Sequence, residues 1–136
     1  MSKRILELFL FDICVAILKI EKTVENFNTP EDLAKSFVHW DSVIREFEII
    51  GEATKHLINT NFLEDKYRVV VDFRNLLIHN YFGIDEEEVW NVIRDDLPEF
   101  KNVIINLMNK LDRNRKLKYQ LIESYIEMNK HLNFLQ

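Results

Sequence analysis

Apolar residues recur along this chain at alternating intervals of three and four, the spacing that places them on one face of an α-helix. The first such stretch covers residues 3–27. Its stripe consists of Ile5, Leu8, Phe9, Ile13, Ala16, Ile17, Ile20, Val24 and Phe27. Further apolar residues lie outside the stripe, so we expect this helix to bury more than one side, against a second helix layer or a partner subunit.

A helix-start signal follows at residues 29–32, where Thr29 can cap the helix, Pro30 suits its first position and two acids occupy its first turn. The apolar spacing then continues to about Asn59, which predicts one long helix. Gly51 lies inside this helix, at a cost of about 1 kcal/mol relative to alanine. We interpret this glycine as a point where another helix of the bundle approaches closely.

The remaining pattern predicts three more helices. One begins at Asp65 and has Gly83 as its stop signal, and another is capped by Asp85, which three glutamates follow. The last begins at the Leu-Pro pair of residues 97–98. Because strand-like alternation is scarce, the predicted fold class is all-α, an antiparallel bundle of about five helices.

The composition of the 136-residue chain is typical of a single domain that buries a sizeable core. Only 2 glycines and 2 prolines occur, which favours long helices with few connections. The single cysteine, Cys14, excludes an internal disulfide and lies in an apolar run, as expected of a packed thiol. The net charge of −5 gives no overall attraction to nucleic acid, so any RNA contact has to be local.

The N-terminal apolar stretch does not read as a membrane or export segment. Glu7 and Asp12 interrupt it, and no small-residue cleavage site follows. It is too short and too charged to span a bilayer. We therefore expect a cytoplasmic protein that does not associate with a membrane.

Candidate chemistry concentrates in residues 73–83, which contain Arg74, His79 and Tyr81. On a helix, Arg74 and His79 differ by a rise of about 7.5 Å and a rotation of about 140°, which is not one clean face but is close enough for the long guanidinium to swing toward the imidazole. A histidine near neutrality beside a fixed cation suits metal-free RNA cleavage, in which one group moves protons and the other holds the phosphate. The structural alternative is that Arg74 pairs with Asp72 or a neighbouring helix and that His79 caps its helix or is a core residue with satisfied hydrogen bonds.

Glu48, Glu52 and His56 form one column of the second helix and are the only arrangement that suggests a metal. A metal site in a helical bundle also needs ligands from other helices, such as Glu-x-x-His motifs, and the chain has none. We therefore interpret the column as a solvated or salt-bridged face and expect no metal and no cofactor.

The run Arg-Asn-x-x-x-His-x-Tyr at residues 74–81 is followed by Phe-Gly-Ile-Asp at 82–85, Val-Trp at 89–90 and Asp-Leu-Pro at 96–98. Together with the block at residues 43–53, these motifs resemble the HEPN superfamily, and within it the HepT branch of toxin ribonucleases. The likeness runs from about residue 5 to about residue 107. The connection before the motif helix is shorter than the Pro- and Trp-containing connection usual in that branch.

This resemblance implies an all-α bundle that forms a homodimer or higher oligomer, with the motif helices of two subunits facing across a cleft. It also implies a metal-independent endoribonuclease acting as the toxin of a toxin–antitoxin pair. Arg74 then corresponds to the phosphate clamp and His79 to the general acid and base. Asn75 either orients the His79 ring or makes a packing or backbone contact. Tyr81 matches the tyrosine that a partner nucleotidyltransferase antitoxin modifies with AMP, and its alternative role is packing against aromatic neighbours.

A second interpretation stays open, in which the bundle is a catalytically silent module that dimerises or binds nucleotide beside a nucleotidyltransferase. Growth arrest on expression without the antitoxin would distinguish the active ribonuclease from the silent module.

The resemblance does not extend over the C-terminal part of the chain. We therefore divide the chain into a bundle at residues 1–111 and an extension at 112–136. Residues 110–118 contain five basic residues against one aspartate. Apolar residues at helical spacing follow, so we expect a helical extension packed on the same domain. The basic run is either a solvated face or a phosphate-contacting patch. The candidate RNA-binding residues are Arg113, Arg115, Lys116 and Lys118.

Overall fold

The computed structural model describes residues 3–80 and 83–111, and over these residues the chain forms helices and no strands. The predicted all-α class is therefore confirmed. The α-helices are α1 (Lys3–Val24), α2 (Pro30–Lys35), α3 (Phe37–Asn59), α4 (Arg68–His79), α5 (Glu86–Asn91) and α6 (Leu97–Leu111). The predicted extension at 112–136 lies outside the described residues.

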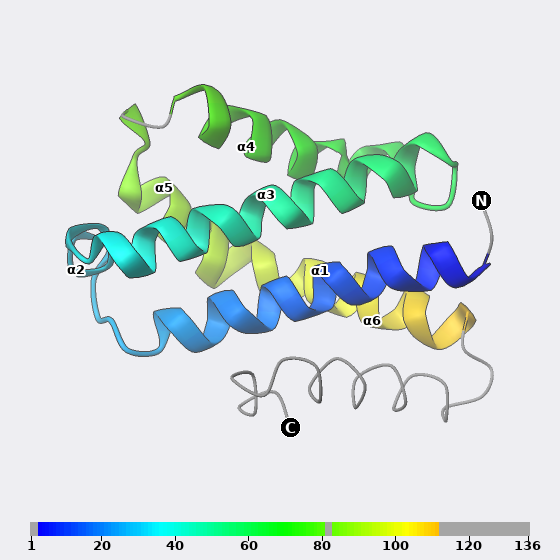
Figure 1. Cartoon of the computed structure of the whole chain (residues 1–136), viewed down its shortest axis with the longest axis horizontal. Coiled ribbons are helices and arrows are strands. Elements are labelled where there is room, and N and C mark those ends of the chain that lie inside the picture. The colour runs from blue at the N-terminus through cyan, green and yellow to red at the C-terminus, as the bar shows by residue number, and fades with distance from the viewer. Residues whose placement is uncertain (1–2, 81–82, 112–136) are drawn as a thin grey trace.

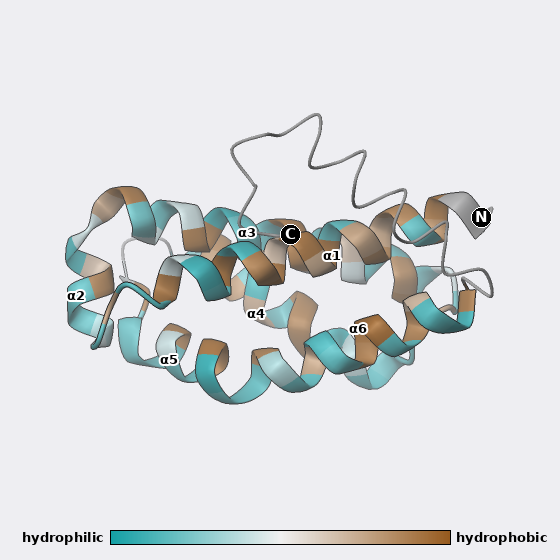
Figure 2. Cartoon of the chain, turned by 90° about the horizontal axis from the view of Figure 1, so that it is seen from below, coloured by the Kyte–Doolittle hydropathy of each residue, from teal (hydrophilic) through white to brown (hydrophobic). Residues whose placement is uncertain are grey.

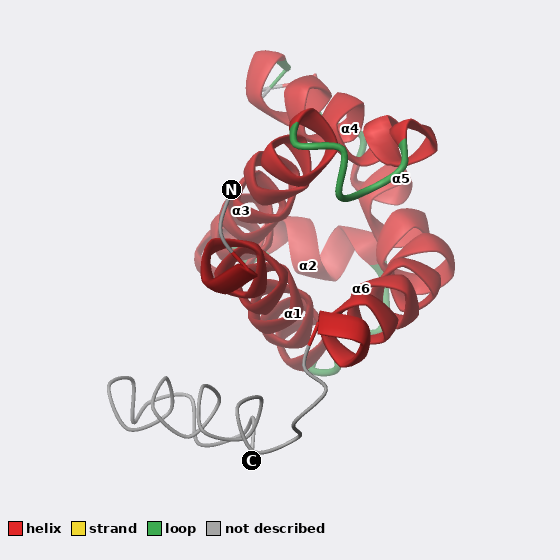
Figure 3. Cartoon of the chain, turned by 90° about the vertical axis from the view of Figure 1, so that its right-hand side faces the viewer, coloured by secondary structure: helices red, strands yellow, loops and turns green. Residues whose placement is uncertain are grey.

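The long helices run side by side, with α3 between α1 and α4 (Figure 1). Seen along the bundle, α2 crosses its far end, where it contacts α3 and α5 (Figure 3). Helix α4 is thus held mainly by α3, because α3 is the long helix against which it packs. Among the described helices, none is long and apolar enough to cross a membrane.

Helix α1 buries two sides, because it packs against both α3 and α6. Apolar residues follow much of its length (Figure 2). Its buried apolar residues are Leu10, Phe11, Ile13, Val15, Ala16, Ile17 and Ile20. An ion pair between Lys101 Nζ and Glu21 Oε1, at 2.9 Å, also joins α6 to α1. The expectation that the first helix buries more than one side is confirmed. Cys14 is a half-buried thiol.

The prediction of one helix from residue 30 to residue 59 is wrong, because the chain breaks at Ser36. This residue has φ −91° and ψ 87°, outside the helical region. Its N–H still donates to Leu33 O at 3.1 Å, which closes α2. Its Oγ lies 2.6 Å from His39 Nδ1 in the first turn of α3. A serine side chain that bonds locally competes with helical hydrogen bonding, which explains the break.

Two predicted helix starts are confirmed by their capping bonds. Thr29 Oγ1 accepts from the N–H of Asp32 at 3.1 Å at the start of α2. Asp85 Oδ1 accepts from the N–H of Glu87 at 3.0 Å at the start of α5. Each bond satisfies one of the N–H groups that a first helical turn leaves without a partner.

The prediction that Gly83 stops the motif helix is wrong, since α4 ends at His79. Asn80 occupies the C-cap position with φ −120° and ψ 37°. Its N–H donates to Leu76 O at 3.0 Å, and its side-chain Nδ2 donates to the same oxygen at 3.3 Å. The asparagine side chain thus takes part in closing the last turn, three residues before the glycine.

Helices α5 and α6 are not separated by a restart at Leu97, because a π-helical turn at Val92–Asp96 joins them. The N–H of Leu97 donates to Val92 O, five residues back. Pro98 has no N–H to offer to the carbonyl of Arg94, so an ordinary α-helix could not pass here without losing a bond. Apolar residues before, within and after this turn are buried in the core. These residues are Val89, Ile93, Leu97, Phe100 and Ile104.

A charged residue, Glu46, is buried on the α1 side of α3 with 8% of its surface exposed. Its Oε1 lies 3.9 Å from Lys19 Nζ. Burial raises the pKa of the Glu46 carboxyl, and the positive charges of Lys19 and Arg45 act in the opposite direction.

Candidate active site

Arg74 lies in the second half of α4, with the aliphatic stem of its side chain against α3 at Gly51. A Cβ atom at position 51 would lie 2.5 Å from Arg74 Cγ and 3.2 Å from Cδ, and still closer to Cβ. The glycine therefore allows the arginine stem to rest on the backbone of α3. The predicted close approach at Gly51 is confirmed, and the approaching group is a side chain of α4.

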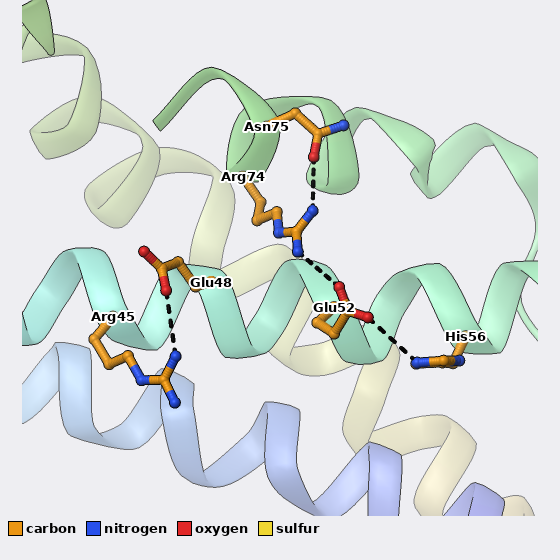
Figure 4. Close-up of polar contacts among 6 residues, drawn as sticks. All are labelled: Arg45, Glu48, Glu52, His56, Arg74 and Asn75. Carbon is orange, nitrogen blue, oxygen red and sulfur yellow. Dashed lines mark hydrogen bonds and ion pairs between the residues drawn. The ribbon is translucent and has the colours of Figure 1, made fainter. Parts of the chain in front are cut away.

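Two hydrogen bonds hold the Arg74 guanidinium (Figure 4). Nη2 donates to Glu52 Oε2 on α3 at 2.7 Å, and Nη1 donates to Asn75 Oδ1 on α4 at 2.8 Å. The Nε atom is buried and has no hydrogen-bond partner. The side chain as a whole is 22% exposed, so the cation lies near the surface with its orientation set by two neighbours.

The second oxygen of Glu52 faces along α3 toward His56 (Figure 4). Glu52 Oε1 lies 3.4 Å from His56 Nε2. The His56 ring in turn stacks on Phe9 of α1, with centroids 4.9 Å apart and planes at 12°. Contacts therefore run from α1 through α3 to the guanidinium on α4, which ties the position of Arg74 to three helices.

The column of Glu48, Glu52 and His56 is a salt-bridged face, as predicted. Arg45 Nη1 contacts Glu48 Oε2 at 3.3 Å, one turn before the pair between Glu52 and Arg74. Within the described part of the chain, no group of three or more His, Cys, Asp and Glu side chains could hold a metal ion.

The expectation that the Arg74 guanidinium swings toward His79 is wrong within a single copy of the chain, because the guanidinium bonds to Glu52 and Asn75 instead. The two residues are five apart on α4, which corresponds to a rotation of about 140°. Arg74 therefore faces α3, whereas His79 is exposed at the end of the helix. No described residue forms a hydrogen bond or an ion pair with the imidazole. The Asn75 side chain bonds to Arg74, and it makes no bond to the His79 ring.

The exposed side of α4 that carries His79 also carries apolar residues. Val69 is 65% exposed and Leu76 is 41% exposed, and Asp72 lies exposed between them. Residues 69, 72, 76 and 79 recur at helical spacing and so share one face. The motif helix thus presents its arginine to α3 and its histidine, among apolar neighbours, to the outside.

The remaining predicted site residues, Tyr81 and the basic group at 113–118, lie outside the described residues. Sequence reasoning placed Glu52 only on a salt-bridged face and missed its contact with the candidate clamp. The available signal was its position beside Gly51, because a glycine that admits a neighbouring helix also brings the next residue close to that helix.

Comparison with protein families matches residues 13–107 to a family described as HepT-like ribonucleases. A Methanocaldococcus jannaschii protein named "Putative RNase" is 34% identical over 108 residues, covering 76% of this chain and 97% of that protein. A Thermococcus cleftensis protein named "Probable ribonuclease HepT" is 35% identical over 97 residues, 68% of this chain and 86% of that protein.

A longer Methanocaldococcus jannaschii protein, named "Gamma-glutamylcyclotransferase and putative RNase", is 32% identical over 133 residues. The match covers 96% of this chain but spans only 59% of that relative's length. No solved structure matches the chain.

Proposed function

The chain belongs to the family of HepT-like ribonucleases in the HEPN superfamily, and on that premise we propose that it is a metal-independent endoribonuclease. In this proposal it cleaves RNA with Arg74 and His79 in the cleft of a homodimer. The observation that carries the proposal is the state of these two groups on α4. One is a cation whose orientation two hydrogen bonds set, and the other is an imidazole exposed on the outside of the same helix.

The chemistry of each group follows from its type and surroundings. The Arg74 guanidinium has N–H groups left over after its bonds to Glu52 and Asn75, and these can bind phosphate oxygens as negative charge develops on them. His79 transfers protons near neutral pH. It takes the proton of the RNA 2′-OH, whose oxygen attacks phosphorus, or gives a proton to the departing 5′ oxygen. The products are a 2′,3′-cyclic phosphate and a 5′-hydroxyl end.

The dimer enters the proposal because one copy of α4 directs Arg74 and His79 to different sides. A second copy that packs against the exposed face of α4 would cover Val69 and Leu76 and bring its own His79 to the first. Two imidazoles on either side of one phosphate can then act separately as base and acid. The cleft would also bring the arginine of one subunit within reach of a phosphate beside the histidine of the other.

RNA cleavage by the purified protein, with analysis of the product ends, tests the reaction. We expect cleavage to persist in EDTA and to fall by about 10² to 10⁴ in His79→Ala, the range typical of a lost acid–base group. Arg74→Ala should also abolish it, while both variants keep their helical circular dichroism. Cleavage that stops in EDTA, or that continues normally in His79→Ala, would refute the assignment.

Mixing the two inactive variants tests the shared cleft. If subunits exchange, a dimer of one Arg74→Ala subunit and one His79→Ala subunit still has one arginine and one histidine in its cleft. We therefore expect the mixture to cleave RNA faster than either variant alone, although more slowly than the parent, whose cleft has two histidines. A stable monomer in sedimentation at micromolar concentration would contradict the dimer cleft, whereas an inactive mixture of demonstrably exchanged subunits would show that both histidines are required.

We further propose that the ribonuclease is the toxin of a toxin–antitoxin pair and that a nucleotidyltransferase antitoxin silences it by adding AMP to Tyr81. Support comes from the position of this phenol two residues after His79. A phosphate charge there would repel RNA phosphate and crowd the imidazole. Expression alone should arrest growth, and mass spectrometry after co-expression should find the adduct on Tyr81. An adduct elsewhere would remove Tyr81 from the proposal, and normal growth would favour the silent module.

A further inference from the structure

The orientation of the Arg74 guanidinium depends on a residue of another helix, Glu52, which lies in the block at residues 43–53 and outside the motif at 74–81. Glu52 Oε2 accepts from Nη2 at 2.7 Å, across the contact between α3 and α4. The stem of Arg74 is confined separately, since it rests on α3 at Gly51. With the stem confined, the remaining freedom lies in the last torsions of the side chain, and these are the torsions that a bond to Nη2 restricts.

The contacts leave part of the guanidinium free for a ligand. A guanidinium has five N–H donors in one plane, one on Nε and two on each Nη atom. Nε is buried, and Glu52 and Asn75 each take one bond from one Nη atom. One N–H on each Nη atom therefore remains. Because the plane is fixed by the other bonds, these two donors point in a set direction.

A carboxylate beside a phosphate clamp could instead compete with the phosphate. The contact geometry favours a carboxylate that orients the guanidinium over one that competes with phosphate, because only one carboxylate oxygen, Oε2, contacts Arg74. The other oxygen, Oε1, lies 3.4 Å from His56 Nε2, and His56 stacks on Phe9. The carboxylate is thus anchored on its own helix and does not close over both Nη atoms of Arg74.

We infer that Glu52 is a positioning residue, which holds the Arg74 guanidinium in the orientation that binds the scissile phosphate. This inference rests on the proposed ribonuclease function. It assigns to α3 a direct part in the site, because the arginine of the motif helix receives its orientation from a carboxylate 22 residues earlier in the chain.

The test compares Glu52→Gln, Glu52→Ala and the control Glu48→Ala by steady-state RNA cleavage. Glutamine keeps an oxygen that can accept from Nη2, so we expect its kcat within a few-fold of the parent. Alanine leaves the guanidinium free to turn, and we expect kcat to fall by about 10- to 100-fold with a smaller change in KM. Glu48 lies one turn away on the same face and pairs with Arg45, so Glu48→Ala should cleave normally.

A double-mutant comparison separates positioning from a general effect on the fold. In an Arg74→Ala background there is no guanidinium to orient, so adding Glu52→Ala should cause no further loss of cleavage. The Glu52 and Glu48 variants should keep the melting temperature of the parent, because an ion pair that is partly exposed to solvent contributes little to stability. Arg74→Ala also removes the stem that packs at Gly51, so the double variant is compared with Arg74→Ala alone. A further loss in the double variant would overturn the inference, because Glu52 would then act without Arg74.

Other outcomes also distinguish the possibilities. Faster cleavage and tighter RNA binding in both Glu52 variants would show competition with phosphate and overturn the inference. Normal cleavage in Glu52→Ala, with none in Arg74→Ala, would overturn the inference alone and leave the ribonuclease intact. If the parent does not cleave RNA, or Arg74→Ala cleaves normally, the proposed function itself has failed.

Discussion

The contact between Gly51 and Arg74 makes Gly51→Ala an informative substitution. In an ordinary helix this change stabilises the protein, because alanine is a better helix former than glycine. Here the new Cβ would lie 2.5 Å from Arg74 Cγ, which is far inside van der Waals contact. The atoms it meets belong to the stem of the arginine, so they cannot move aside unless α4 moves away from α3.

The gain in helix propensity and the clash with the arginine stem act on stability in opposite directions, and their magnitudes can be compared. The gain in helix propensity is about 1 kcal/mol. Forcing an extra methyl group into a packed contact costs about 1 to 3 kcal/mol, and stem atoms place the cost in the upper part of this range. We therefore expect a net loss of about 1 to 2 kcal/mol, or a fall in melting temperature of about 3 to 8 °C. The displaced guanidinium should also lower RNA cleavage by about tenfold or more.

Thermal and urea unfolding measure the stability, and Gly83→Ala provides the control. A Cβ at Gly83 meets nothing within 4 Å, and its φ is not positive. That variant should be as stable as the parent or slightly more stable. The swapped variant Gly51→Ala with Arg74→Gly returns one side chain to the contact and should recover part of the packing, although not the activity. If Gly51→Ala is more stable than the parent and cleaves RNA normally, the reasoning about this contact is wrong.

Other substitutions test other parts of the structure. Burial raises the pKa of Glu46 above its ordinary value of 4.5, so the carboxyl stabilises the fold below that pH and loses this contribution as the pH rises through the folded-state pKa. The melting temperature of Glu46→Gln should therefore fall less than that of the parent when the pH is raised from acid to neutral. The same fall in both proteins would contradict this reasoning. Thr29→Ala removes the oxygen that accepts from the N–H of Asp32, so it should lower the free energy of unfolding in urea by about 1 kcal/mol. Thr29→Ser keeps the hydroxyl and should be about as stable as the parent. An equal loss of stability in both variants would show that the capping bond does not contribute. If the C-terminal basic run contacts RNA, changing it to glutamine should weaken RNA binding and reduce its salt dependence in anisotropy titrations, and unchanged titrations would exclude it. The residues changed together are Arg113, Arg115, Lys116 and Lys118.

Features encoded by neighbouring residues were predictable from the sequence. The caps at Thr29 and Asp85 depend on a side chain and an N–H two or three residues away, and both form as predicted. The all-α class followed from the apolar spacing. The rotation between Arg74 and His79 follows from helix geometry alone, and the structure retains it.

Breaks within a continuing pattern were not predictable. The apolar spacing passes from Leu33 to Phe37 across Ser36 without a gap, although Phe37 is 73% exposed and Leu33 is fully buried. A serine inside a helix is usually tolerated, so its bond to His39 had no distinct signal. Farther along the chain, Pro98 suggested the start of a new helix. The π-helical turn that precedes it has no local sequence pattern of its own, so it could not be predicted.

The part of the site that the sequence concealed depends on register between helices. Glu52 and Arg74 are 22 residues apart, and their contact requires a particular alignment of α3 and α4. Gly51 indicated that a close approach exists on α3 but not which residue approaches. Only the three-dimensional packing supplies that identity.

The π-helical turn at Val92–Asp96 bears on how length changes in related chains should be interpreted. Insertions and deletions are ordinarily assigned to loops, because a residue added to a regular helix rotates everything after it by about 100°. A five-residue hydrogen-bonded turn holds one residue more than an α-turn, so it is a place within a helix where one residue can be gained or lost. Such a loss would convert the π-turn into an ordinary α-turn and leave the face of α5 that carries Val89 on the core side. An alignment gap of one residue near residue 94 would therefore be compatible with an unbroken helix and with unchanged hydrophobic residues in α5.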